Sequence, residues 1–169
     1  YRKLQNIEIK NLNRVNIFAG GNNLGKTSIL ELFYLFTRLN NFQSIIDLER
    51  FRGRFYQEFP TKWFNKIFVE DIQIEADFNS TQCSLVINKH ETTENIEKSH
   101  YLNSIVTDAN VNGDNFSSTI HLFDNKDPEF YFEKSQFLCQ ATFSSPYRYD
   151  GSLLKRAHAK AVQEKYFDD

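Results

Sequence analysis

Nine consecutive residues near the start of the chain have the types and spacing of a phosphate-binding loop. They follow the pattern G-x-x-x-x-G-K-[ST] and are Gly20, Gly21, Asn22, Asn23, Leu24, Gly25, Lys26, Thr27 and Ser28. Glycine at both ends allows the chain to pass close to a polyphosphate, with amide groups facing the phosphate oxygens. Lys26 would contact the β- and γ-phosphates, and the Thr27 hydroxyl would bind Mg²⁺. The motif therefore predicts a site for a nucleoside triphosphate and Mg²⁺.

The segments on either side of this loop have the patterns that phosphate binding requires. Residues 15–19 form a short, mostly apolar segment, which is typical of a buried strand. The residues after the loop predict a helix that ends near Leu39. Residues 4–10 alternate in their second half, so they are expected to form an antiparallel hairpin with residues 15–19. One apolar helical face is expected from Ile29, Leu32, Phe33 and Phe36. The alternative is a glycine-rich turn that only happens to precede a helix.

The rest of the chain predicts hairpins rather than alternating strands and helices. A short helix capped by Ser44 is expected to run through Arg50, and another helix is expected over residues 152–166. The polar residues 89–118 are expected to form an exposed excursion with one strand near residues 102–106. Strands are expected at residues 69–78, 83–88, 119–123, 130–132 and 137–143. The predicted fold class is α/β, an α+β-like arrangement with an antiparallel and mixed sheet packed on the helix that follows the loop.

Residues 50–66 mix basic and aromatic side chains. The cations are Arg50, Arg52, Arg54, Lys62 and Lys66, and the rings between them are Phe51, Phe55, Tyr56, Phe59, Trp63 and Phe64. Such a mixture binds nucleic acid when the cations contact phosphates and the rings stack on bases. It also arises in an amphipathic segment whose rings lie in the core, and we favour this second interpretation.

Composition limits the functions that are open to the chain. Its 169 residues suffice for one domain with a core, and a net charge of -2 argues against general binding of polyanions. Cys83 and Cys139 lack metal-ligand spacing and are expected to be buried thiols, and the four histidines have no ligand-like spacing. No apolar run reaches the roughly 18 residues of a membrane span and no signal peptide is recognised, so we expect a cytoplasmic protein.

Residues 6–12 and 15–31 carry a resemblance to a known family. They read NIEIKNL and VNIFAGGNNLGKTSILE, and Asn22 stands where the family's loop has its asparagine. This resembles the N-terminal lobe of the ATP-binding-cassette type, AAA-family ATPases of the SMC, RecF and OLD (overcoming lysogenisation defect) group, and looks most like the OLD-type branch. The resemblance implies ATP and Mg²⁺ as ligands and a homodimer or higher oligomer formed through the ATPase head. It also implies DNA repair or antiphage defence, with DNA and a nuclease or effector as partners.

The resemblance also assigns roles beyond the loop. In this group a glutamine after the antiparallel strands contacts Mg²⁺ and the attacking water, which makes Gln140 a candidate catalytic residue beside Lys26, with Gln136 as the alternative. The family's apolar strand ending in Asp-Glu and its Ser-Gly-Gly-like signature are missing from the sequence, and Asp124 only superficially resembles the acidic ligand. The chain also contains no methionine. We therefore expect residues 1–169 to be a single lobe of a longer ATPase, inactive alone.

Two other classes of function remain open at this point. A GTPase or a small-molecule kinase would share the loop, but the guanine-reading motif that begins at Asn125 and Lys126 has Pro128 where an aspartate should stand. The expected run of antiparallel strands also differs from the parallel sheets of those enzymes. A third possibility is an interaction module that binds nucleotide without hydrolysing it.

Overall fold

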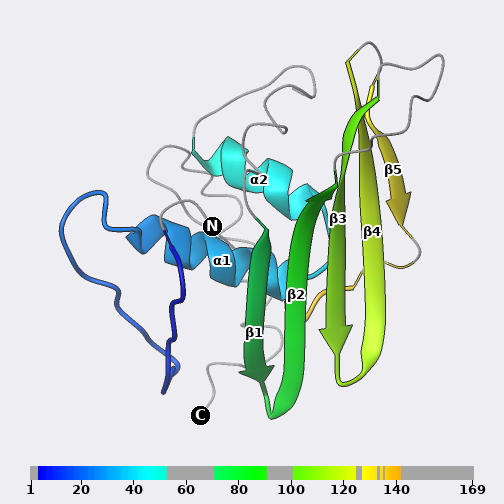
Figure 1. Cartoon of the computed structure of the whole chain (residues 1–169). Coiled ribbons are helices and arrows are strands. Elements are labelled where there is room, and N and C mark those ends of the chain that lie inside the picture. The colour runs from blue at the N-terminus through cyan, green and yellow to red at the C-terminus, as the bar shows by residue number, and fades with distance from the viewer. Residues whose placement is uncertain are drawn as a thin grey trace, which may run out of the picture.

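The computed structural model describes residues 4–52, 71–90, 101–124, 127–132, 134 and 136–141, and Figure 1 shows its arrangement. Two helices, α1 (Lys26–Arg38) and α2 (Gln43–Phe51), lie on one face of a sheet (Figure 1). The strands of this sheet are antiparallel and follow sequence order. They are β1 (Ile72–Phe78), β2 (Thr81–His90), β3 (Tyr101–Val111), β4 (Asp114–Phe123) and β5 (Glu129–Phe132). This arrangement confirms the expected α/β class, although the described sheet is antiparallel throughout rather than mixed.

A tight turn joins β1 to β2, as the sequence predicted. Asn79 and Ser80 have φ angles of 50° and 62° and connect β1 to β2, where Phe78 pairs with Thr81. Two adjacent residues with positive φ match the twist of antiparallel strands, and asparagine tolerates that conformation well. The β1–β2 hairpin and the pairing of β4 with β5 are therefore confirmed.

The strand expected near residues 102–106 is confirmed within β3. The exposed excursion expected around it is wrong in the described residues, because residues 89–90 end β2 and residues 101–118 belong to β3, β4 and the turn between them. Ile105 and Ala109 of β3 are 0% and 3% exposed. These strands lack a clear alternation of apolar and polar residues, because polar side chains also occupy positions that face the core. Asn103, Thr107 and Ser118 are all buried. Residues 91–100 lie outside the described part of the chain.

Helix α1 is confirmed, but its most deeply buried face is not the predicted one. The buried residues of α1 are Ser28, Glu31, Tyr34, Leu35 and Phe36. Of the predicted apolar face, only Phe36 is fully buried, and its other members border a groove beside β1. The difference arises because α2 packs on the Tyr34 side of α1, as the edge-to-face contact between the Tyr34 and Phe51 rings shows (centroids 5.8 Å apart).

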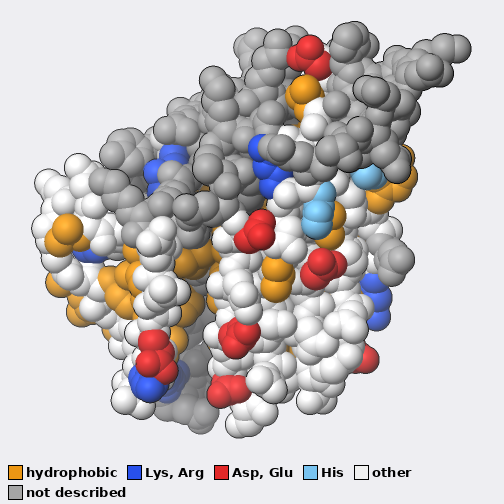
Figure 2. Space-filling model, viewed as in Figure 1, with side chains coloured by type: hydrophobic (Ala, Val, Ile, Leu, Met, Phe, Trp, Pro, Cys, Tyr) orange, Lys and Arg blue, Asp and Glu red, His pale blue; other side chains and the backbone are white. Residues whose placement is uncertain are grey.

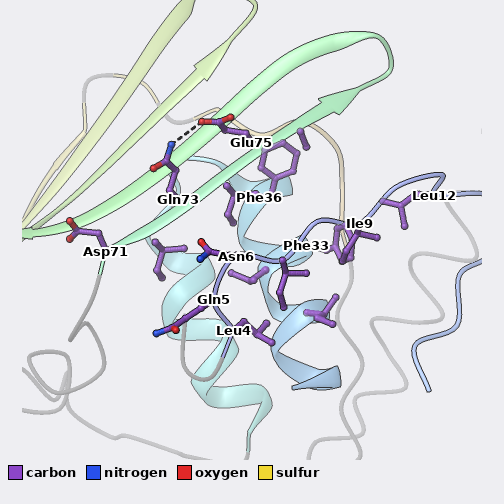
Figure 3. A pocket seen from close by; sticks show the side chains of 16 residues that line it. Leu4, Gln5, Asn6, Ile9, Leu12, Phe33, Phe36, Asp71, Gln73 and Glu75 are labelled. Carbon is purple, nitrogen blue, oxygen red and sulfur yellow. Dashed lines mark hydrogen bonds between the residues drawn. The ribbon is translucent and has the colours of Figure 1, made fainter. Parts of the chain in front are cut away.

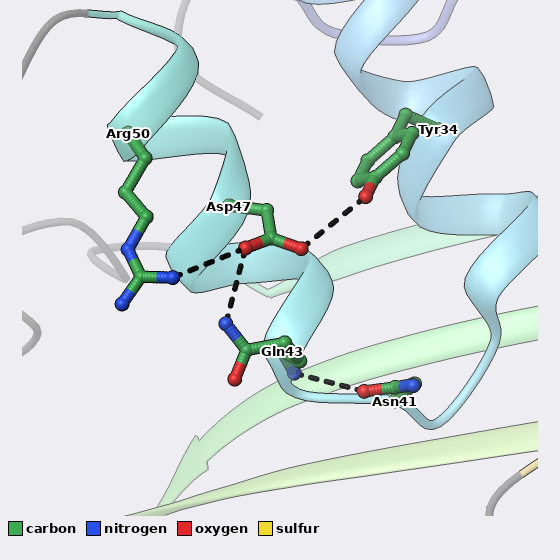
Figure 4. Close-up of polar contacts among 5 residues, drawn as sticks. All are labelled: Tyr34, Asn41, Gln43, Asp47 and Arg50. Carbon is green, nitrogen blue, oxygen red and sulfur yellow. Dashed lines mark hydrogen bonds and ion pairs between the residues drawn. The ribbon is translucent and has the colours of Figure 1, made fainter. Parts of the chain in front are cut away.

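Polar contacts fix how α2 begins and how it meets α1 (Figure 4). The Asn41 side-chain oxygen accepts a hydrogen bond from the Gln43 amide at 3.0 Å, so Asn41 rather than Ser44 caps α2. The Tyr34 hydroxyl donates to the Asp47 carboxylate at 3.4 Å. Burial, together with the nearby Asp47 charge, raises the pKa of the Tyr34 hydroxyl, so it remains a donor at neutral pH.

The predicted N-terminal hairpin is wrong, because residues 4–20 form no strand. Val15 and Ile17 are 80% and 87% exposed instead of buried. A groove of about 460 Å³ lies between residues 4–12 on one side and α1 and β1 on the other (Figure 3). An extended segment becomes a strand only by pairing, and a two-stranded hairpin alone is marginally stable in water. The segment therefore stays irregular although its alternation is typical of a strand.

Two other predictions fall at the end of the described chain. The strand expected at residues 137–143 is wrong for its described part, because residues 136–141 are irregular and bond to the end of α1. The helix expected at residues 152–166 lies outside the described residues. None of the helices in the described part of the chain is long and apolar enough to cross a membrane.

Candidate functional site

The glycine-rich loop leads directly into α1 and leaves the start of that helix open. Gly25 precedes the first helical residue with φ of 90°, in the left-handed region that favours glycine. No side chain caps the helix at this position. The first amide groups of a helix have no partner within it, and the helix dipole gives this end partial positive charge. The start of α1 is thus arranged to receive an anion.

Close packing of Leu4 against Gly25 also favours glycine at this position. A Cβ atom added at Gly25 would lie 2.6 Å from Cδ2 of Leu4, which is closer than real Cβ contacts. Leu4 is itself only 9% exposed. The loop is therefore held against the N-terminal segment, and any side chain at position 25 would both strain the backbone and displace Leu4.

The ammonium group of Lys26, near the end of the loop, bonds back to the two glycines at the beginning of the loop. Lys26 Nζ donates hydrogen bonds to the carbonyl oxygens of Gly20 at 2.9 Å and Gly21 at 2.6 Å. These contacts stabilise the loop in a closed curve. They also place a positive charge inside the curve, where phosphate oxygens would lie.

The two hydroxyl residues after Lys26 differ in exposure. Thr27 is exposed, whereas Ser28 is 8% exposed on the buried side of α1. Only the Thr27 hydroxyl is therefore accessible to a ligand-bound cation. Among the described residues, no group of three or more His, Cys, Asp or Glu is placed to hold a metal ion. Mg²⁺ at this site would consequently be held by the Thr27 hydroxyl together with phosphate oxygens and water.

Comparison with known proteins gives the family. A family model described as the AAA ATPase domain matches residues 1–164, which is nearly the whole chain. The chain belongs to the AAA ATPase domain family. No match was found among curated proteins or among solved structures. Membership of the AAA ATPase domain family indicates ATP binding and hydrolysis in general, and such domains generally use ATP and Mg²⁺.

The structure of this AAA ATPase domain does not bring the candidate glutamines to the loop. Gln136 and Gln140 belong to an irregular segment that bonds to the C-terminal end of α1, where Leu138 N donates to Thr37 O at 2.9 Å. Lys26 begins the same helix, and about 18 Å of helix axis separates it from Arg38. Gln140 is exposed at this distant end. Its catalytic role remains a prediction that this arrangement does not support.

The acidic candidate also lies away from the loop. Asp124 directly follows β4, and β4 and the beginning of α1 lie apart in Figure 1. Asp124 and Thr27 are therefore not placed to share one Mg²⁺ in this arrangement. Asn125 and Lys126, which begin the incomplete guanine motif, lie outside the described residues.

The described part of the basic and aromatic segment packs as core rather than as a DNA surface. Arg52 donates two hydrogen bonds to the Glu31 carboxylate, from Nε at 2.5 Å and from a terminal nitrogen at 2.8 Å. Phe51 packs on Tyr34, and Arg50 pairs with Asp47 at 3.6 Å. The core interpretation is confirmed for the Phe51 ring, which is partly buried against the core, whereas Arg50 is exposed and residues 53–66 lie outside the described part of the AAA ATPase domain.

The outer face of the sheet is also unsuited to DNA (Figure 2). Glu75, Asp77 and Asp108 are exposed at outward-facing positions of β1 and β3. No Lys or Arg occupies an outward-facing position on the strands that the structure describes. Because phosphate binding depends on cations, a DNA contact of this AAA ATPase domain would have to lie elsewhere.

Sequence reasoning missed three contacts of the loop and its helix. Leu4 packs against Gly25 at the loop, Glu31 pairs with Arg52 further along α1, and Asn40 after α1 bonds to the segment that follows β5. Only the ion pair had a sequence signal, since a carboxylate on the apolar side of a helix requires a partner. Both cysteines are free thiols as expected, with Cys83 buried and Cys139 partly buried.

Proposed function

We propose that this AAA ATPase domain is the ATP-binding lobe of an ATPase of the SMC, RecF and OLD group, closest to the OLD-type branch, acting in DNA repair or antiphage defence. The observation that carries the nucleotide assignment is the geometry of the loop. Gly25 opens the start of α1, and the Lys26 ammonium closes the loop by donating hydrogen bonds to the carbonyl oxygens of Gly20 and Gly21. The branch assignment is supported by residues 6–12 and 15–31, which resemble that group.

The residues of the loop take separate roles when a nucleotide binds. Backbone amides of the loop and of the first turn of α1 would donate to phosphate oxygens. The Lys26 ammonium would exchange the Gly20 and Gly21 carbonyl oxygens for those of the β- and γ-phosphates, which are charged and therefore stronger acceptors. The Thr27 hydroxyl would hold Mg²⁺, and the bound Mg²⁺ supplies neutralisation of phosphate charge.

The partners follow from the proposed branch. ATPases of this group close two ATPase heads around nucleotide, so we propose a homodimer or higher oligomer formed through the head. DNA and a nuclease or effector are proposed partners, and the cytoplasm is the proposed location. Nucleotide then acts as a switch, because it favours whichever state binds it more tightly.

Calorimetric titration of the chain with Mg·ATP and with Mg·GTP tests the proposed function. We expect ATP to bind and GTP to bind no more tightly, because Pro128 stands where a guanine-reading aspartate is required. A clear preference for GTP would reject the ATPase assignment in favour of a GTPase. Absence of binding to either nucleotide would reject the nucleotide site itself.

A second prediction is that the 169-residue chain binds ATP without turning it over. The sequence has no apolar strand ending in Asp-Glu to orient the attacking water, and Gln140 lies at the end of α1 away from Lys26. Loss of one preorganised catalytic group commonly costs about a hundredfold or more in rate. A phosphate-release assay checks this, with Lys26→Ala as the control for contaminating ATPases. Hydrolysis that disappears in this variant would show that the chain is catalytically complete.

A further inference from the structure

The segment after β5 is fastened to the end of the phosphate-loop helix. We call the described residues 134 and 136–141 the strap. Leu138 N donates to Thr37 O at 2.9 Å, and a terminal nitrogen of Arg38 donates to Ala141 O at 3.1 Å. The strap has no regular secondary structure, so these bonds and those of Asn40 fix its position.

Asn40 is the central anchor of the strap. Its side-chain nitrogen donates to Lys134 O at 2.7 Å and to Ser118 Oγ at 3.0 Å, and its side-chain oxygen accepts from Gln136 N at 2.9 Å. Asn40 is 0% exposed, so none of these bonds competes directly with water. One buried amide therefore joins the end of α1 to β4 and to two points of the strap.

The phosphate loop and the strap are attached to opposite ends of one rigid element. The loop enters α1 at Lys26, and the strap bonds to the helix end at Thr37 and Arg38. Helices move as units over distances of about 1–2 Å when ligands change the packing at their ends. A shift of α1 that accompanies loop reorganisation would carry the strap with it.

We infer that Asn40 is a positioning residue that couples the strap to α1, so that the nucleotide state of the loop is transmitted to the strap. This inference rests on the proposed function, since it requires a nucleotide in the loop. Asn40 itself touches no part of the loop in any of its hydrogen bonds. Its role would therefore be to link the two ends and not to bind the ligand.

The chain contains its own reporter for this coupling. Cys139 lies within the strap and is partly buried, and Cys83 lies in the core at 1% exposure. Burial raises the pKa of the Cys139 thiol, and the nearby Arg38 guanidinium opposes that shift. Maleimide labelling at constant mildly alkaline pH, followed by peptide mass spectrometry, measures the labelling rates of both cysteines in one experiment. Cys139 then reports release of the strap, and Cys83 reports opening of the whole core.

In the unmodified chain, saturating Mg·ATP is expected to slow Cys139 labelling by about fivefold, a common size of coupling between sites. Asn40→Ala is expected to label Cys139 roughly tenfold faster and to lose the nucleotide dependence, because the strap loses its buried anchor. Its calorimetric affinity for ATP should stay within about twofold of the unmodified chain, since the mutated position is distant from the loop. Asn41→Ala is the matched control, because Asn41 caps α2 and has no hydrogen bond to the strap among those described.

Four results would overturn the inference. If ATP binds in the calorimeter but the labelling rate of Cys139 does not change, the coupling alone is rejected. If ATP does not bind, both the coupling and the proposed function are rejected. An equal increase in the labelling rates of Cys83 and Cys139 in Asn40→Ala would show that the variant destabilises the whole fold and does not specifically release the strap. If Asn40→Ala does not fold, Ser118→Ala removes one partner of the same amide and should give a smaller change of the same sign. An unchanged Cys139 rate in that variant would also reject the inference.

Discussion

Replacement of Lys26 by alanine is expected to weaken Mg·ATP binding by about tenfold to a hundredfold while the fold is retained. Lys26 is the one cation of the described loop, residues 20–28. Hydrogen bonds to charged groups typically contribute about 1.5–3 kcal/mol, which corresponds to this range of affinity. The variant loses both the charge that meets the phosphates and the bonds that close the loop at Gly20 and Gly21. Calorimetric titration of both proteins measures the effect.

Lys10→Ala is the matched control for this prediction. Lys10 is an exposed lysine that pairs only with Glu8 at 2.8 Å among the ion pairs described, and its side chain is 70% exposed. Its removal should leave ATP affinity within about twofold, since exposed charges are screened by solvent. Circular dichroism establishes that both variants are folded. Equal ATP affinities of Lys26→Ala and the unmodified chain would reject the assignment of residues 20–28 as the nucleotide site.

The parts of the fold that were predictable from sequence are those fixed by local chemistry. The loop pattern predicted a left-handed glycine before α1, and Gly25 has this conformation, whereas the phosphate contacts of Lys26 stay a prediction. Asn79 and Ser80 marked the β1–β2 turn because residues of this type tolerate positive φ. The match of the AAA ATPase domain model to residues 1–164 supports the AAA-family part of the resemblance, whereas the SMC, RecF and OLD branch stays a prediction.

The parts that were not predictable depend on contacts between distant residues. Residues 4–10 have the alternation of a strand, but β1 lies across a groove, and alternation does not reveal whether a partner is present. The expected strand at residues 137–143 instead bonds to Thr37 and Arg38 in its described part, and Gln136 just before it bonds to Asn40. Asn40 lies roughly a hundred residues before the strap, and no local pattern indicates such a partner.

The Glu31–Arg52 ion pair is expected to contribute the largest single-residue effect on stability. Glu31 is 0% exposed within α1, and Arg52 binds both of its carboxylate oxygens. Arg52→Met should destabilise the domain by about 3–5 kcal/mol, because it leaves a carboxylate buried without its guanidinium partner. For a domain of this size, such a loss lowers the melting temperature by roughly 6–20 °C. Calorimetric melting and urea denaturation measure both quantities.

Arg50→Met provides the matched control for this ion pair. Arg50 lies two residues earlier and pairs with Asp47 at 3.6 Å, with 47% of its side chain exposed. Exposed pairs of this kind contribute about 0–1 kcal/mol, so this variant should melt close to the unmodified chain. The double variant Glu31→Leu with Arg52→Met should regain much of the lost stability, because replacing both members of a buried pair by apolar groups removes the uncompensated charge. If Arg52→Met is no less stable than Arg50→Met, the Glu31 carboxylate does not depend on Arg52. The basic segment that begins at Arg50 would then again be open to a role in DNA binding.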